Sequence, residues 1–251
     1  MLNGRDVIYT YDGSFEGLMS VVFECYLTHT RPYDICRGEN VQEVLMCCQK
    51  DVETNPERAD RVIRSIYSKI SSAAFYHIYC AYLSEAEGRE LAVLDFLDAG
   101  YKYGASVVNR LNLDGVYTLM NIAKTVASEA HLYLGFVRFK KLSGGIYYSE
   151  IEPKAHVLPI ISNHFCERFS SMPFMIHDIK HGECLVYNGK SVEIRRVESE
   201  PILKYDEDEK LFQSMWRDFY DTIAIKERRN EKCRNSLLPK RYRRCMTEFA
   251  V

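Results

Sequence analysis

A change in the spacing of apolar residues near position 134 is the feature that most restricts the fold of this chain. Between residues 55 and 133 apolar side chains recur every three or four positions, which is the period of helices that bury one face. After residue 134 short segments alternate with period two and are separated by glycine-containing turns, as in antiparallel strands. A run of helices followed by a run of strands predicts an α+β fold rather than alternating α/β units.

The helical part is expected to cover about residues 14–133. Asn55-Pro56-Glu57 has the capping residue and the first-turn proline of a helix start, and Ser71-Ser72 can begin a second helix. Two more helices are expected at about 90–101 and 115–133. These assignments leave almost no room for strands between residues 55 and 133.

The sheet part is expected to cover about residues 134–200, with a helix over 157–169. Ser143-Gly144-Gly145 is typical of a hairpin turn between two strands. The short strand at 6–11 is expected to join this sheet, which would make residues 1–251 a single, mostly antiparallel α+β domain. The strands predicted in the sheet part cover residues 135–140, 146–150, 174–178, 183–187 and 191–197.

The C-terminal part, about residues 208–251, combines an amphipathic helix with a concentrated positive charge. The helix is predicted from the apolar stripe between Leu211 and Ala224. Residues 226–244, the basic segment, contain nine Lys or Arg against two Glu, a net charge of +7. The remaining residues carry 24 basic against 33 acidic groups. This segregation predicts a face that binds a polyanion such as nucleic acid, although cations also favour a solvated helix end.

The residues expected to bind nucleic acid are the cations of the basic segment, which would contact phosphates, and one tyrosine, which would stack on a base. They are Lys226, Arg228, Arg229, Lys232, Arg234, Lys240, Arg241, Tyr242, Arg243 and Arg244.

Several classes of protein and of site are disfavoured by the sequence. No apolar run is long enough to span a bilayer, and the first residues lack the pattern of a signal peptide, so we expect a cytoplasmic protein. The nine cysteines are therefore expected to be reduced thiols. Neither the cysteines nor the seven histidines show the spacing of a known metal site, and no nucleotide-binding motif is present, so no metal and no cofactor are expected.

Five polar side chains could form a catalytic pocket if the elements that carry them converge. Two histidines, a carboxylate and two arginines could together bind a phosphate or carry out catalysis. The alternative is that they only join helix to sheet. The candidates are Glu129, His131, Arg138, His164 and Arg168.

Stretches throughout the chain resemble a bacterial family of DNA metabolism or DNA repair proteins built on a domain of unknown function. The resemblance implies a radical-SAM protein as a partner, and some relatives carry the domain ahead of a uracil-DNA-glycosylase-like domain. It supplies no catalytic residues. The matching stretches are Tyr11-Asp12-Gly13-Ser14-Phe15-Glu16-Gly17, Glu129-Ala130-His131, Gly135-Phe136-Val137-Arg138-Phe139, Val157-Leu158-Pro159, His164-Phe165, Arg168-Phe169, Pro173-Phe174, Ile176-His177-Asp178, Ile225-Lys226-Glu227-Arg228-Arg229-Asn230 and Leu238-Pro239-Lys240-Arg241-Tyr242.

Three hypotheses for the function remain at this point. The first is a DNA-binding accessory protein that presents DNA to a radical-SAM enzyme. The second is a DNA-acting hydrolytic enzyme that uses the five-residue pocket. The third is a protein-interaction module whose basic segment binds an acidic protein surface.

Overall fold

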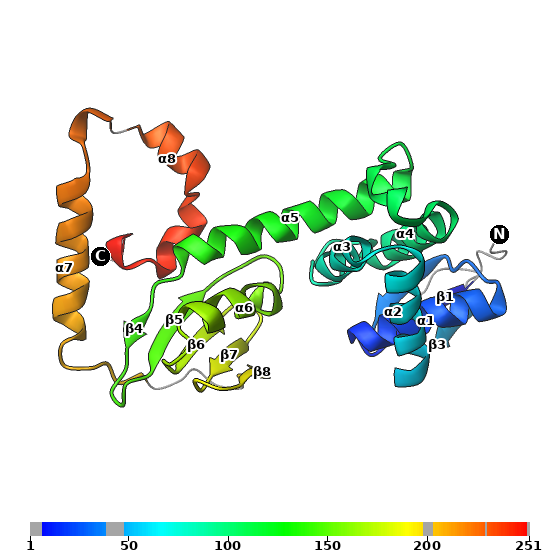
Figure 1. Ribbon diagram of the computed structural model, residues 1–251, viewed down its shortest axis with the longest axis horizontal. Helices are drawn as coiled ribbons and strands as arrows, with labels where there is room; N and C mark the ends of the chain where they lie inside the picture. Colours follow the sequence, from blue (N-terminus) through cyan, green and yellow to red (C-terminus); the bar gives the residue numbers. More distant parts are fainter. Residues whose placement is uncertain (1–6, 39–47, 198–202, 229, 250–251) are drawn as a thin grey trace. The chain divides into compact units, whose positions relative to one another are not determined.

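The computed structural model of the protein describes residues 7–38, 48–197, 203–228 and 230–249 (Figure 1). Helices and two β-sheets are mixed over these residues, so the predicted α+β fold class is confirmed. From the sequence, a single domain is expected. By its contacts it divides into two compact units, Met1–Ala127 and Ser128–Val251, and the division falls inside the long helix α5 (Asp114–Phe136).

The first unit is built on a three-stranded parallel sheet. Its order is β2-β1-β3, with β1 (Val7–Tyr11) between β2 (Asp34–Arg37) and β3 (Cys48–Asp51). Helix α1 (Phe15–Thr28) connects β1 to β2 and makes their parallel pairing possible. The expectation that the first strand joins the later sheet is therefore wrong, because β2 and β3 occupy both of its edges.

Helices complete the first unit, as the apolar spacing predicts. The side chains of Asn55 and Ser71 accept hydrogen bonds from the backbone amides of Arg58 and Ala74, so both expected caps are present. The buried stripes of these helices pack with α1 into one apolar core. The remaining elements of this unit are α2 (Pro56–Lys69), α3 (Ser72–Tyr82), α4 (Arg89–Tyr103), the 3-10 helix η1 (Gly104–Asn109) and the first part of α5.

The second unit contains a five-stranded sheet in the order β4-β5-β6-β7-β8. Helix α6 (Leu158–Arg168) crosses from β5 to β6, so these two strands are parallel, and the other pairs are antiparallel. The strands are β4 (Lys140–Lys141), β5 (Tyr147–Ile151), β6 (Phe174–Asp178), β7 (Glu183–Tyr187) and β8 (Val192–Arg196).

The prediction of a strand over residues 135–140 is wrong. Helix α5 continues to Phe136, and only Lys140 and Lys141 pair with β5. The aromatic residues that suggested alternation pack in different directions. The ring of Phe136 lies 5.2 Å from that of Tyr242, whereas Phe139 contacts Phe169 with a centroid distance of 5.0 Å. Aromatic packing around a helix end thus resembles period-two alternation when only the sequence is read.

The predicted C-terminal helix is confirmed as α7 (Glu209–Ile223), and its apolar stripe is largely exposed. Leu211, Phe212 and Met215 keep more than half of their surface accessible within the part of the chain that the structure describes. Among the described helices, none has the length and apolar character that a bilayer crossing requires. After α7 follow the 3-10 helix η2 (Lys226–Arg228), α8 (Glu231–Leu237), and the 3-10 helices η3 (Lys240–Cys245) and η4 (Thr247–Phe249).

Candidate functional site

Tyr242 packs the basic segment against the end of α5 within the second unit. Its ring is buried against Tyr133 and Phe136 at the end of α5, with centroid distances of 5.2 Å to each. Burial of the hydroxyl raises the pKa of Tyr242. A ring enclosed in this way is not presented to a ligand, so the expectation that Tyr242 stacks on a base does not fit the structure.

Four arginines of the basic segment are engaged inside the same unit. Arg241 Nη2 lies 3.0 Å from Glu129 Oε1, and Arg244 Nη1 lies 3.0 Å from Glu152 Oε2. Arg243 donates to the backbone oxygen of Leu238 at 2.9 Å, and Arg234 donates to Glu231 at 2.7 Å. Part of the charge that the sequence assigns to a polyanion therefore holds the segment in place.

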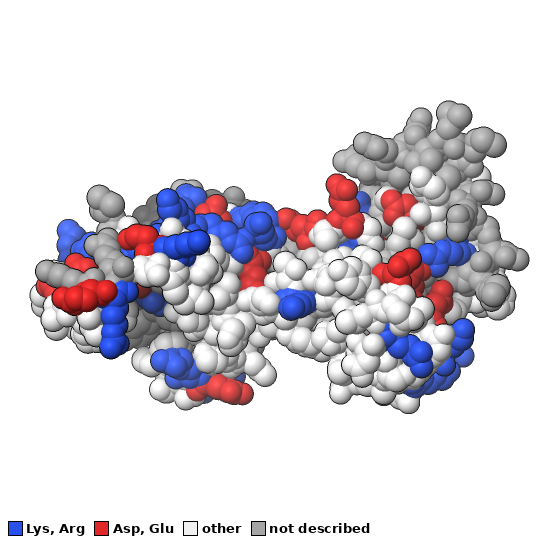
Figure 2. Space-filling model, turned by 90° about the horizontal axis from the view of Figure 1, so that it is seen from above, with Lys and Arg blue, Asp and Glu red and all other residues white. Residues whose placement is uncertain are grey.

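Three other cations of the segment are exposed. Within the described residues, the side chains of Arg228, Lys232 and Lys240 form no hydrogen bond, ion pair or ring contact. The backbone of Lys226 begins η2, and Arg229 lies outside the described residues. Figure 2 shows blue side chains on the C-terminal unit, at the left, as several clusters among red and white ones rather than as one continuous patch.

Glu129 is a buried anchor for the chain around it. Its Oε2 accepts hydrogen bonds from the backbone amides of Lys154 and Ala155, both at 3.0 Å. Its Oε1 forms the ion pair with Arg241 without the alignment of a hydrogen bond. This carboxylate is therefore occupied by structural contacts from the β5–α6 connection and from the basic segment.

Arg138 forms a second anchor with Glu248. Its Nη2 donates to Glu248 Oε1 at 2.8 Å and its Nε donates to Oε2 at 3.2 Å, while Trp216 Nε1 donates to Oε2 at 3.1 Å. Burial by itself would raise the pKa of Glu248, but the hydrogen bonds from Arg138 and Trp216 outweigh it and hold the pKa below the usual value.

The other members of the predicted pocket lie elsewhere on the unit. His131 is exposed on α5, and His164 and Arg168 are on α6, where the ring of His164 lies 5.2 Å from that of Phe165. Within the described residues, no hydrogen bond or ion pair joins any two of the five candidates. The five side chains therefore do not form one hydrogen-bonded pocket in the described part of the chain.

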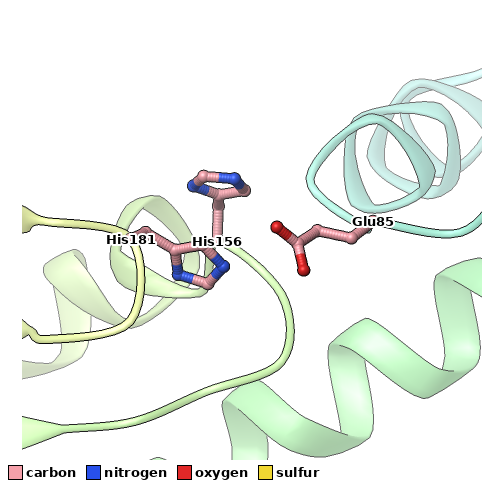
Figure 3. Close-up of side chains that lie close together, drawn as sticks. All are labelled: Glu85, His156 and His181. Atoms are coloured by element: carbon pink, nitrogen blue, oxygen red, sulfur yellow. The ribbon is translucent and has the colours of Figure 1, made fainter.

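A different set of side chains, which we call the histidine cluster, gathers at the β6–β7 turn. Asp178 ends β6, Glu183 begins β7, His181 lies in the turn between them, and His156 lies in the β5–α6 connection. The rings of His156 and His181 stack with a centroid distance of 4.0 Å and an interplanar angle of 29°. Figure 3 shows the two rings one above the other.

Each histidine of the cluster is oriented by its own carboxylate. His181 Nδ1 donates to Asp178 Oδ2 at 2.5 Å, and His156 Nδ1 donates to Glu183 Oε2 at 3.2 Å. A carboxylate can only accept, so the proton is assigned to Nδ1 in both rings. The bond from His156 lowers the pKa of Glu183 in spite of the opposing effect of burial.

The sequence patterns described above do not indicate the histidine cluster. A pattern that could have indicated it is the close spacing of Asp178, His181 and Glu183, three groups of metal-binding or acid–base type within six residues. His156 is 25 positions before His181, and only the path of the chain brings the two rings together.

A comparison with known families shows where this chain belongs. The model of a domain of unknown function, DUF4130, matches residues 87–248, more than half of the chain. The chain belongs to the DUF4130 family. A comparison with curated proteins finds no match. The DUF4130 region contains the histidine cluster and the whole basic segment, whereas the three-stranded sheet precedes it.

Two open grooves border α7 in the DUF4130 region. One, of about 630 Å³, is lined by Arg138, Phe139, Lys141, Phe212 and Trp216 among others. The other, of about 660 Å³, lies beside the basic segment and is lined by Tyr220, Ile223, Arg228, Arg234 and Leu237 among others. Both combine aromatic or aliphatic side chains with arginine.

Proposed function

We propose that this DUF4130 protein binds nucleic acid through the exposed cations of its basic segment. The observation that carries the proposal is that Arg228, Lys232 and Lys240 have no contact that their charge would serve inside the described part of the chain. Exposed cations without internal partners are the groups that can neutralise phosphates and release counterions.

The exposed aromatic side chains of α7 favour a single strand as the ligand. Phe212, Trp216 and Phe219 lie on the helix that leads into the basic segment and all remain exposed. Aromatic rings beside cations are the combination with which proteins bind single strands without reading their sequence. In a duplex the faces of the bases are already stacked, so these rings would contribute less.

The place of such a protein in DNA metabolism rests on the family resemblance given above. We propose an accessory DNA metabolism or repair protein that presents nucleic acid to a partner enzyme, with a radical-SAM protein as that partner. The arrangement of the five candidate polar side chains supports an accessory role over a hydrolytic pocket built from them, since no hydrogen bond or ion pair joins any two of them within the described residues.

Fluorescence anisotropy with labelled single-stranded and duplex DNA across a salt series tests the proposal. The variant Arg228→Ala/Lys232→Ala/Lys240→Ala removes the three exposed cations. If all three contact phosphates of a single strand, the slope of log K against log salt concentration should fall by about 2. Binding to the single strand should be the tighter of the two.

A matched control removes three exposed lysines outside both the basic segment and α7, with the variant Lys124→Ala/Lys190→Ala/Lys204→Ala. This control changes net charge equally and should keep the parent slope. Equal losses in both variants would mean that only net charge matters, which contradicts a site on the basic segment. Absence of binding by the parent protein would contradict the proposal and favour an acidic protein as the partner of the segment.

A further inference from the structure

The histidine cluster brings together side chains whose atoms could hold a metal ion. We propose that His156 and His181 bind a divalent transition metal ion, Zn²⁺ in the first place, through their Nε2 atoms. This inference concerns residues separate from the basic segment, and it does not depend on nucleic-acid binding.

The orientation of both rings is the first argument. Metal-ligating histidines almost always donate the other ring N–H to a carboxylate or carbonyl oxygen, which fixes the tautomer and raises the basicity of the ligating nitrogen. His181 has this arrangement with Asp178, and His156 has it with Glu183. Finding the arrangement twice in one cluster is more specific than finding it once.

The rigidity of the carboxylate behind His181 is the second argument. Asp178 is fully buried, and its Oδ1 accepts from the backbone amides of Lys180 and His181 at 3.1 and 3.2 Å. The carboxylate therefore cannot rotate away from His181 without losing both bonds. These bonds also stabilise the β6–β7 turn, but such a turn does not require His156, which comes from a different connection.

The distance between the rings is the third argument. One ring nitrogen of His156 lies within 4.8 Å of one ring nitrogen of His181. With Zn–N bonds of about 2.0–2.1 Å, two nitrogens on one ion can be at most about 4.2 Å apart. The side chain of His156 is partly exposed, and we expect it to turn so that both nitrogens reach one ion.

The number of ligands determines what kind of site this is. Two imidazoles leave coordination positions for water or for an oxygen of a bound ligand, unlike the four protein ligands of a closed structural zinc site. Imidazole also suits Cu²⁺ and Ni²⁺, and Cu²⁺ should bind more tightly than Zn²⁺ by the usual order of affinities.

Titration of the full chain with Co²⁺ and Zn²⁺ after chelator treatment tests the site. The parent protein should develop visible Co²⁺ absorption bands at one equivalent, and Zn²⁺ should abolish them. His156→Ala and His181→Ala should each weaken Zn²⁺ binding at least tenfold, and Asp178→Asn should weaken it by about 10–100-fold. The matched controls His131→Ala and His164→Ala should bind as the parent does.

A second measurement keeps the test decisive if a variant does not fold. In the parent protein alone, Zn²⁺ should shift the imidazole nitrogen resonances of two histidines, those of His156 and His181. Metal binding that is equally strong in the double variant His156→Ala/His181→Ala, or imidazole shifts confined to other histidines, would overturn the proposal. Absence of metal binding by the parent would overturn it as well.

Discussion

Replacing Glu248 by alanine should release α7 from the rest of the second unit. Glu248 accepts two hydrogen bonds from Arg138 and one from Trp216, so one carboxylate links η4, α7 and the segment after α5. Apart from this link, the described contacts of α7 include the ring contact of Tyr220 with Phe249, at 5.7 Å, and a hydrogen bond from the backbone amide of Lys141 to Glu209. The helix is thus held at few points.

The expected loss can be estimated from the exposure of the groups. A hydrogen bond to a charged group contributes about 1.5–3 kcal/mol, and breaking a buried pair costs about 3–5 kcal/mol. The side chain of Glu248 is only 2% exposed, but that of Arg138 is 23% exposed and can be rehydrated when its partner is removed. We therefore expect Glu248→Ala to weaken the attachment of α7 by about 2–4 kcal/mol.

The only tryptophan in the sequence makes this loss measurable. Trp216 donates its indole N–H to Glu248, so its emission should shift to the red and its quenching by acrylamide should increase in the variant. In urea, the Trp216 signal should change before the circular dichroism of the remaining helices. A double-mutant cycle with Arg138→Ala should show coupling between the two residues.

Glu227→Ala is the matched control, because the side chain of Glu227 is exposed and forms no hydrogen bond or ion pair within the described residues. It should leave the emission and the urea transition of Trp216 unchanged. Unchanged emission and quenching in Glu248→Ala, with both transitions within about 0.5 kcal/mol of the parent, would refute the view that Glu248 holds α7.

Two further predictions follow from the same structure. The pKa of Glu248 lies below its usual value of 4.5, so the ionised carboxylate stabilises the fold above that pH, and this stabilisation is lost as the pH falls through the lowered pKa. The urea midpoint of the Trp216 signal differs between the parent and Glu248→Ala, and this difference should shrink below about pH 4.5. In the first unit, Gly115→Ala would place its Cβ 2.3 Å from Cβ of Asp95, and urea unfolding should show a free energy of unfolding lower by about 1–3 kcal/mol. The control Gly135→Ala, on the same helix, meets nothing within 4 Å and should not destabilise the protein.

Local patterns in the sequence predict most of the helices and the later strands correctly. Asn55 and Pro56 indicate the start of α2, and the apolar spacing after Leu211 indicates α7, because caps and periodicity act within a few residues of the chain. The turns of the second sheet are also indicated by local residues, since the positive φ angles at Gly182 and Gly189 suit residues without a side chain. Predictions of this kind need no knowledge of distant neighbours.

Contacts between distant residues decide the rest. The residues near β1 in the sequence do not indicate that β1 pairs with β2 on one side and with β3 on the other. Lys240 and Arg241 are adjacent cations, yet Lys240 stays exposed while Arg241 pairs with Glu129, which is 112 positions away. His156 meets His181 only because α6 returns the chain to the sheet beside β5.

The sequence alone thus determined most of the elements, the fold class and the concentration of charge in residues 226–244, because these depend on composition and short-range periodicity. The tertiary structure decided which cations remain exposed and which histidines lie together. Whether a charged or ligating side chain is available depends on what surrounds it in space, and neighbours far apart along the chain supply most of those surroundings here.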